Sequence, residues 1–162
     1  GRTFGVTSAT GRWPIGDTSD PGNRLGQSPW RSPSVFNFFR PGYVPPGHEL
    51  AANQITAPEF QLVNESTVAG YLNFMQSVIG NGISSGDVSA NYAHELSLAL
   101  DPPKLLAHLN LRLAADAIHP TTLTELSTAV ATISASTATG QLNRVKAAIL
   151  LVMAAPEYLI QK

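Results

Sequence analysis

Apolar side chains recur at helical spacing through the second half of the chain. Between residue 64 and about residue 79, the apolar positions follow the i, i+3, i+4, i+7 pattern of one helix face: Val68, Tyr71, Leu72, Met75, Val78 and Ile79. Asn64 stands at the N-cap of this predicted helix, and Gly80-Asn81-Gly82 ends it. A capping box, Thr56-Ala-Pro-Glu59, predicts a short helical turn through Leu62 just before it.

Three further helices are predicted after residue 100. Asp101 and Pro102 begin one, whose buried stripe consists of Leu105, Leu106, Leu109 and Leu113. A second capping box, Thr122 to Glu125, begins the next, which runs to about Ser134. The last covers roughly residues 142–154 and is apolar over most of its circumference, and residues 157–161 add a final turn. Residues 80–100 are predicted to be a loop with one turn near residues 92–100. Because alternating strand patterns are absent, the sequence predicts an all-α bundle of about five helices.

The N-terminal part has a different pattern. Residues 1–62 contain eight of the 12 Pro and eight of the 13 Gly, which break helices and strands. The same stretch is rich in aromatic residues, unlike disordered segments: Trp13, Trp30, Phe36, Phe38, Phe39, Tyr43 and Phe60. We therefore expect residues 1–55 to form a long irregular arm packed on a helical body of residues 56–162, the two making one structural unit. A short helix is predicted near residues 33–39, capped by Ser32 or Ser34.

Composition and charge exclude several classes of function. The 162 residues are 13% charged, with a formal net charge of −1. This balance gives no electrostatic footprint for nucleic acid, and no apolar run is long enough to span a membrane. With no Cys, the chain has no disulfide and no thiolate metal site. Because the chain begins with Gly1 and reads from the start like the middle of a protein, we expect it to be a fragment of a longer one.

The histidines give little support for a metal site. His94-Glu95 begins like the HExxH motif of zinc enzymes, but Leu98 stands where the second His belongs. His48 follows Pro-Pro-Gly and is interpreted as a loop residue. His108 lies in a polar stripe and is interpreted as solvated. No metal and no cofactor are predicted.

The densest group of polar and aromatic residues lies between residues 31 and 73. Its weak candidates for ligand binding are Arg31, Asn37, Arg40, Tyr43, Asn64 and Glu65. Glu59 or Glu65 could pair with one of the two arginines and fix a loop onto a helix. A groove that binds a sugar or another ligand is the alternative, and catalysis is a third. The residue types and their spacing leave these three interpretations open.

Four blocks of the sequence resemble a known family. They are LGQSPWRSPSVFNFFRPGYVPPG (residues 25–47), APEFQLVNESTVAGYLNFM (57–75), LLAHLNLRL (105–113) and RVKAAILLVMAAPEYLIQK (144–162). Together they are similar to the C-terminal part of the bacterial domain of unknown function 1800 family. The resemblance implies a largely helical protein several hundred residues long. It also implies export to the periplasm or the outside of the cell, and a gene near that of a sulfatase-like protein. The family has no agreed catalytic residues, so none are assigned by resemblance.

Two functions follow as hypotheses. In the first, the chain is a binding or assembly module without its own catalytic site. Its partners are then the missing N-terminal part of the parent protein and a sulfatase-like protein. In the alternative, the chain is part of a hydrolase-like enzyme that acts on envelope or extracellular polymers. Its site, formed with the missing part, would use Arg31, Arg40, Asn64 and Glu65. The sequence does not decide whether the protein is an enzyme.

Overall fold

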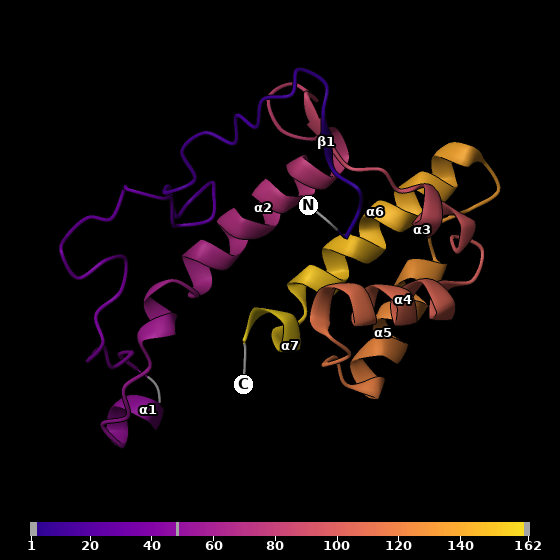
Figure 1. Cartoon of the computed structure of the whole chain (residues 1–162). Helices are drawn as coiled ribbons and strands as arrows, with labels where there is room; N and C mark the ends of the chain where they lie inside the picture. The colour runs from indigo at the N-terminus through magenta and orange to yellow at the C-terminus, as the bar shows by residue number, and fades with distance from the viewer. Residues whose placement is uncertain (1–2, 48, 161–162) are drawn as a thin grey trace. The chain divides into compact units, whose positions relative to one another are not determined.

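Helices account for most of the regular structure (Figure 1). A computed structural model describes residues 3–47 and 49–160, apart from the side chains of residues 65 and 66. The helices are α1 (Glu49–Ala52), α2 (Glu65–Asn81), α3 (Ala93–Ser97), α4 (Pro102–Ala114), α5 (Pro120–Ala131), α6 (Ala138–Ala154) and α7 (Pro156–Leu159). A 3₁₀ turn covers Pro58–Gln61, and two short strands are β1 (Thr7–Ser8) and β2 (Val88–Ser89). The mainly helical fold expected from the sequence is confirmed.

The contacts between residues divide the chain into two units. The helical unit consists of residues up to Pro14 together with residues from Val78 onward, and the loop unit consists of Ile15–Ser77. Each unit is described by itself below. The predicted boundary near residue 55, and the packing of an N-terminal arm on a helical body, stay predictions.

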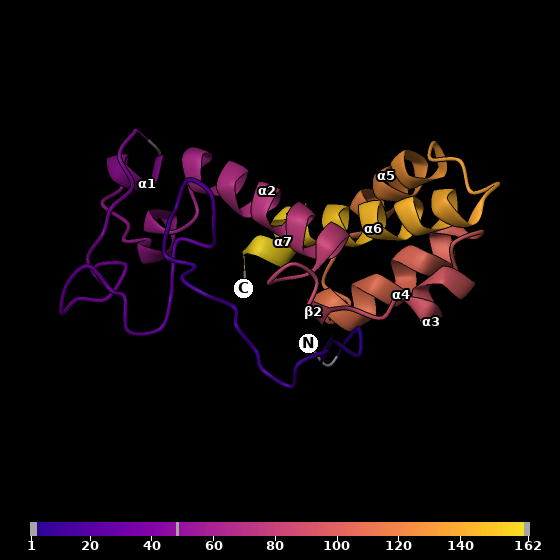
Figure 2. The same ribbon diagram turned by 90° about the horizontal axis from the view of Figure 1, so that it is seen from above.

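Helices α4, α5 and α6 pack against one another and form the core of the helical unit (Figure 2). The largest fully buried apolar side chains come from all three: Leu105, Leu106 and Leu109 from α4, Val130 from α5, and Val145, Ile149 and Val152 from α6. Burial of a side chain of this size stabilises the fold by about 1.5–3 kcal/mol. The predicted stripe of α4 is therefore confirmed, except that Leu113 is only half-buried.

One buried cation lies in this core without a carboxylate. Arg144 of α6 is 8% exposed. Its Nε donates to the carbonyl of Ile133 at 2.9 Å, its Nη1 to the carbonyl of Ala99 at 3.0 Å, and its Nη2 to the carbonyls of Ala131 and Ile133. Ala131 is the last residue of α5, where free carbonyls carry the negative end of the helix dipole. Arg144 thus ties the end of α5 and the segment before α4 to α6.

The N-terminal segment is attached to the helical unit by a two-stranded antiparallel ladder that the sequence analysis missed. Thr7 pairs with Ser89 and Ser8 with Val88. Asp87 reinforces the ladder because its carboxylate accepts from the Thr10 backbone N–H at 2.8 Å and from the Thr10 hydroxyl at 2.9 Å. The sequence therefore predicts the mainly helical fold but not this short ladder. Strands of two residues are too short to show an alternating pattern.

The capping residues in the sequence predicted some helix starts correctly and others wrongly. Asn64 caps α2, since its Oδ1 accepts from the Thr67 N–H at 3.1 Å, and Asp101 caps α4 by accepting from the Lys104 N–H at 3.2 Å. The two predicted capping boxes do not form. The 3₁₀ turn has Ala57 at its N-cap with no side-chain hydrogen bond, and α5 begins at Pro120 with His119 as its cap. Thr137 caps α6, which therefore begins four residues before the predicted start.

The helix predicted near residues 33–39 is also wrong. That segment is a turn, in which the Asn37 N–H donates to the Ser34 carbonyl at 3.1 Å. Asn37 has a φ of +67°, which a right-handed helix does not accommodate. The Ser34 hydroxyl accepts from the Phe36 N–H at 3.2 Å, a local bond that competes with helix formation.

In the loop unit, one turn of backbone lies directly on α2. Gly70 of α2 is buried, and a Cβ placed on it would lie 2.6 Å from the carbonyl carbon of Gly22. Asp20 shapes this turn by accepting from the Gly22 N–H at 2.8 Å. The guanidinium of Arg24 lies over the ring of Phe74, 5.3 Å from its centroid. These contacts hold residues 20–24 against α2.

The carboxylate of Glu157 in α7 lies at the N-terminus of α5. Its Oε1 accepts from the Thr122 hydroxyl at 2.8 Å and from the His119 N–H at 3.3 Å. Hydrogen bonds from its own backbone N–H and from the Thr122 hydroxyl hold the pKa of Glu157 below its ordinary value of 4.5. A carboxyl whose pKa is lowered by folding stabilises the fold above its unfolded pKa and loses this contribution as the pH falls.

We therefore expect Glu157→Gln to lower the thermal unfolding midpoint at neutral pH. The difference from the unmodified chain should shrink as the pH falls below 4.5 and through the lowered pKa of Glu157. Thermal unfolding followed by circular dichroism across this pH range measures it. Glu125→Gln is the control, because Glu125 lies exposed on α5. A deficit for Glu157→Gln that is the same at every pH would contradict this account.

Candidate functional site

The residues predicted as ligand-binding candidates all belong to the loop unit. Arg31 Nη1 pairs with Asp17 Oδ2 at 3.2 Å, a partner that the sequence analysis did not suggest. Both side chains are exposed, so the pair adds little stability. Hydrogen bonds from the hydroxyl and backbone N–H of Ser19, together with the charge of Arg31, lower the pKa of Asp17.

The other candidates hold the loop in place through their backbone. The Arg40 N–H donates to Gln61 Oε1 at 2.5 Å, and the Tyr43 N–H donates to the Arg40 carbonyl at 3.0 Å. The Tyr43 carbonyl in turn accepts from the Ala57 N–H at 2.8 Å. Asn64 caps α2, and the side chain of Glu65 lies outside the described residues. Whether these side chains form a ligand site stays a prediction.

Asn37 differs from the others because it lines a surface hollow. The hollow has a volume of about 620 Å³ and is bounded by Trp30, Phe38 and Leu25 among others. Its floor includes Thr18 and Ser28, two polar residues that are buried. The Thr18 hydroxyl donates to the Gln27 carbonyl, which closes the loop between them. The hollow thus sits on a loop with a defined backbone.

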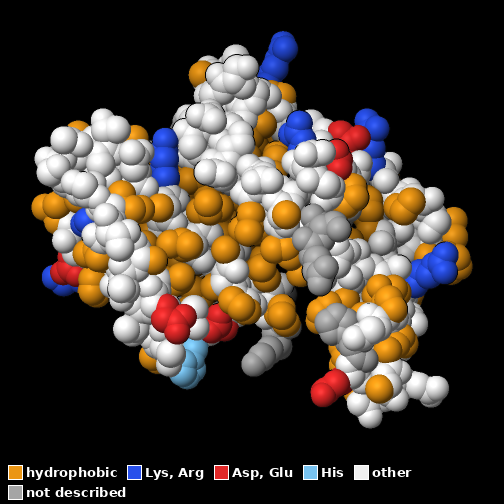
Figure 3. Space-filling model, turned by 180° about the vertical axis from the view of Figure 1, so that it is seen from behind, with side chains coloured by type: hydrophobic (Ala, Val, Ile, Leu, Met, Phe, Trp, Pro, Cys, Tyr) orange, Lys and Arg blue, Asp and Glu red, His pale blue; other side chains and the backbone are white. Residues whose placement is uncertain are grey.

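Large apolar side chains project from the loop unit. Trp30 is fully exposed, Val35 is 95% exposed and Phe36 is 64% exposed. The exposed large apolar side chains of the loop unit are together called the apolar loop surface. They are Ile15, Leu25, Trp30, Val35, Phe36 and Ile55. On the face of the molecule that Figure 3 draws, hydrophobic side chains reach the surface over much of the chain. Within the loop unit, Trp30 and Phe36 are thus exposed, and the packing of the arm on the helical body stays a prediction.

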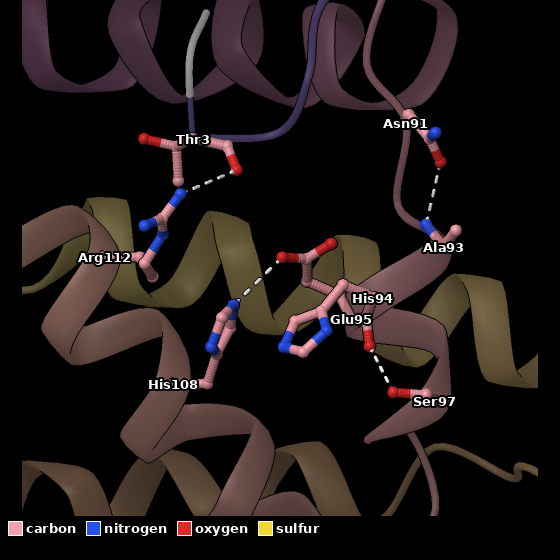
Figure 4. A network of polar contacts seen from close by, with 8 residues as sticks. All are labelled: Thr3, Asn91, Ala93, His94, Glu95, Ser97, His108 and Arg112. Atoms are coloured by element: carbon pink, nitrogen blue, oxygen red, sulfur yellow. Dashed lines mark hydrogen bonds and ion pairs between the residues drawn. The ribbon is translucent and has the colours of Figure 1, made fainter.

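A second polar group lies in the helical unit, between α3 and α4 (Figure 4). Glu95 of α3 has a side chain that is only 3% exposed, and its Oε1 lies 3.0 Å from Nε2 of His108 on α4. The ring of His94 lies beside that of His108, with 4.6 Å between centroids. The prediction that His108 is solvated is wrong, because most of its side chain is covered and it bonds to Glu95.

Short-range bonds fix α3 so that Glu95 points inward. Asn91 Oδ1 accepts from the Ala93 N–H at 2.9 Å and begins the helix, and the Ser97 hydroxyl donates to the His94 carbonyl at 2.6 Å and ends it (Figure 4). The Asn91 N–H donates to the Phe4 carbonyl at 2.9 Å, which joins this segment to the N-terminal strand region.

Tyr92 forms the inner side of this group. Its hydroxyl donates to the carbonyl of Ile79 at 3.1 Å, and its ring meets that of Phe4 edge to face at 5.6 Å. Burial, together with the nearby charge of Glu95, raises the pKa of Tyr92 to about 12. The phenol therefore stays protonated as a hydrogen-bond donor at neutral pH.

A hollow of about 460 Å³ opens over this group. Its walls include His94, Glu95, His108, Arg112 and Phe4. Arg112 Nη2 donates weakly to the Thr3 carbonyl at 3.5 Å (Figure 4). We call this feature the histidine hollow. It combines two imidazoles, a guanidinium and a buried carboxylate, the side chains that bind charged ligands or transfer protons.

The arrangement does not suit a metal ion. Glu95 and His108 bond to each other, which occupies Oε1 of Glu95 and Nε2 of His108. Within residues 3–47 and 49–160, no group of three His, Asp or Glu could hold a metal ion. His48, considered as a loop residue, lies outside the described residues.

The described helices define a mainly helical protein. In that part of the chain, none of them combines the length and the apolar character needed to cross a membrane. The family model described as "protein of unknown function (DUF1800)" matches residues 6–160, and the chain belongs to this family. The resemblance drawn from the four sequence blocks is thereby confirmed. No curated protein and no solved structure shows a significant match to the chain.

Proposed function

We propose that the chain is a binding and assembly module of an exported bacterial protein, and that it contacts a protein partner through the apolar loop surface. The observation that carries this proposal is the exposure of Trp30, Val35 and Phe36 on a loop held in a defined conformation. Exposed apolar groups of this size mark interaction surfaces when they gather in one region.

The residue types favour a protein partner. Trp and Arg are enriched among the residues that dominate the affinity of protein interfaces, and aromatic side chains generally are enriched in their cores. The exposed Trp30 is the chain neighbour of Arg31, whose partner Asp17 is itself exposed. Apolar side chains and charged pairs are the residue types of an interface core and its polar rim.

The loop is ordered before it meets a partner, which lowers the entropic cost of binding. The Thr18 hydroxyl, the Arg40 N–H and the Tyr43 carbonyl each bond to another part of the loop unit. Only side chains at the tip of the loop, such as Trp30, need to lose rotamer freedom on contact.

The partner that we propose is the sulfatase-like protein expected to be encoded near this gene. Purified partner and the full chain are mixed, and the dissociation constant is measured by interferometry. We expect Trp30→Ser combined with Phe36→Ser to weaken binding by at least about tenfold, the loss typical of an interface centre.

A matched control separates this effect from a general loss of apolar surface. Leu111 on α4 is 64% exposed, the same as Phe36, and lies in the helical unit. Leu111→Ser should leave the dissociation constant unchanged within about twofold. Absence of binding by the unmodified chain, or equal weakening by the two kinds of variant, would overturn the proposal.

A further inference from the structure

The histidine hollow offers hydrogen-bonding groups of three kinds within one small space. Arg112 carries five N–H donors, and the Thr3 carbonyl takes one of them within the described residues. His94 is exposed at the rim, while His108 is partly covered. Phe4 adds an apolar wall. The volume of about 460 Å³ lies in the range of sites that bind small molecules.

The bond between Glu95 and His108 determines which hydrogen bond His108 can form with a ligand. Because a carboxylate accepts, the bond to Glu95 places a proton on Nε2 of His108, and in that tautomer Nδ1 is an acceptor. A hydroxyl group is a donor that fits such a nitrogen. The same bond holds the imidazole in one orientation, because Glu95 is buried and fixed on α3.

The charges in the hollow select the ligand further. Arg112 offers a fork that matches a carboxylate, and it is exposed at the opening. Glu95 also lines the hollow, and its carboxylate disfavours a ligand group with two negative charges. A single carboxylate is therefore favoured over a phosphate dianion.

We propose that the histidine hollow binds a sugar acid, a small ring that carries one carboxylate and neighbouring hydroxyl groups. The carboxylate pairs with Arg112, a hydroxyl donates to Nδ1 of His108, and the apolar side of the ring packs on Phe4. This binding site is separate from the apolar loop surface, and it needs no residue of the loop unit.

The test uses the full chain labelled with ¹⁵N and D-glucuronate as the probe. Nuclear magnetic resonance signals of the imidazole nitrogens of His94 and His108 should shift and saturate as glucuronate is added. D-glucose, which has the same ring without the carboxylate, should produce no saturating shift. Inorganic phosphate should bind more weakly than glucuronate.

Variants on one exposed helix face make the test specific. Arg112→Gln should weaken glucuronate binding by at least about tenfold, since it removes the charged half of a bidentate pair. Lys104→Gln is the control, because Lys104 lies on α4 with an exposed side chain that pairs with Asp101. It should change binding by less than about twofold.

Several results would overturn the proposal. The proposal fails if glucuronate produces no saturating shift or if glucose binds as tightly as glucuronate. It also fails if phosphate binds as tightly as glucuronate, or if Arg112→Gln leaves the affinity for glucuronate unchanged. Phosphate binding of equal strength would show a site for any anion. Equal binding of glucose would show that Arg112 does not select a carboxylate.

Discussion

Replacement of Arg144 by methionine should lower the free energy of unfolding by about 3 kcal/mol. Methionine keeps most of the volume of the side chain in α6 but donates no hydrogen bond. The Ala99 carbonyl would then lose a buried donor, and the Ile133 carbonyl a partly buried one. Each buried acceptor left without a partner costs about 1–3 kcal/mol, which exceeds the gain from no longer burying a cation.

Chemical denaturation followed by circular dichroism measures this loss. Arg112→Met is the control, because Arg112 is exposed on α4 and its bond to the Thr3 carbonyl is weak, at 3.5 Å. It should change the free energy of unfolding by less than about 0.5 kcal/mol. If Arg144→Met cost less than about 1 kcal/mol, the buried carbonyls would have found other donors and the role given to Arg144 would be wrong.

Gly70→Ala should destabilise the loop unit by about 2 kcal/mol, although alanine is the better helix former. The new methyl carbon would lie 2.6 Å from the Gly22 carbonyl carbon and 2.7 Å from the Pro21 carbonyl oxygen. Both neighbours are backbone atoms, so residues 20–24 would have to move away from α2. Hydrogen exchange should rise at the backbone amides of Gly22 and Arg24, which close the turn.

Gly80 provides the matched control for this substitution. It lies in the same helix, and a Cβ placed on it would have no atom within 4 Å. Gly80→Ala should therefore stabilise the protein by up to about 1 kcal/mol, the ordinary preference of a helix for alanine over glycine. Exchange at Gly22 and Arg24 that is the same in Gly70→Ala, Gly80→Ala and the unmodified chain would contradict the packing described for the turn.

The sequence predicts those helix starts that depend on a single residue bonding to its own chain. Asn64 and Asp101 are examples, since each accepts from an N–H three residues ahead. The sequence predicts a helix wrongly where two local signals compete. Ser34 was expected to begin a helix, but its hydroxyl bonds two residues ahead and Asn37 takes a left-handed conformation, which makes a turn.

The functional groups were harder to predict because they depend on distant contacts. Glu95 and His108 are separated by thirteen residues and by the start of α4. Nothing in the spacing of His94, Glu95 and Leu98 indicates that the carboxylate turns inward to meet His108. The charge of Arg144 likewise gave no signal of burial, because its partners are backbone carbonyls that every residue carries.

The aromatic content of the N-terminal part predicts that its side chains need a contact. Trp30 and Phe36 are exposed on the loop unit, and their packing on the helical body stays a prediction. Composition indicates that aromatic groups need a contact, and it does not indicate whether the contact is in the same chain or in a partner.

Fluorescence of Trp30 tests the proposed binding role most directly. The chain has two tryptophans, so Trp13→Phe leaves Trp30 as the single emitter. Alone, this variant should be quenched readily by acrylamide, because Trp30 is fully exposed. Saturating amounts of the sulfatase-like partner should shift the emission to the blue and protect it from quenching. Emission and quenching that stay the same with the partner bound would contradict the proposal that the apolar loop surface is the contact.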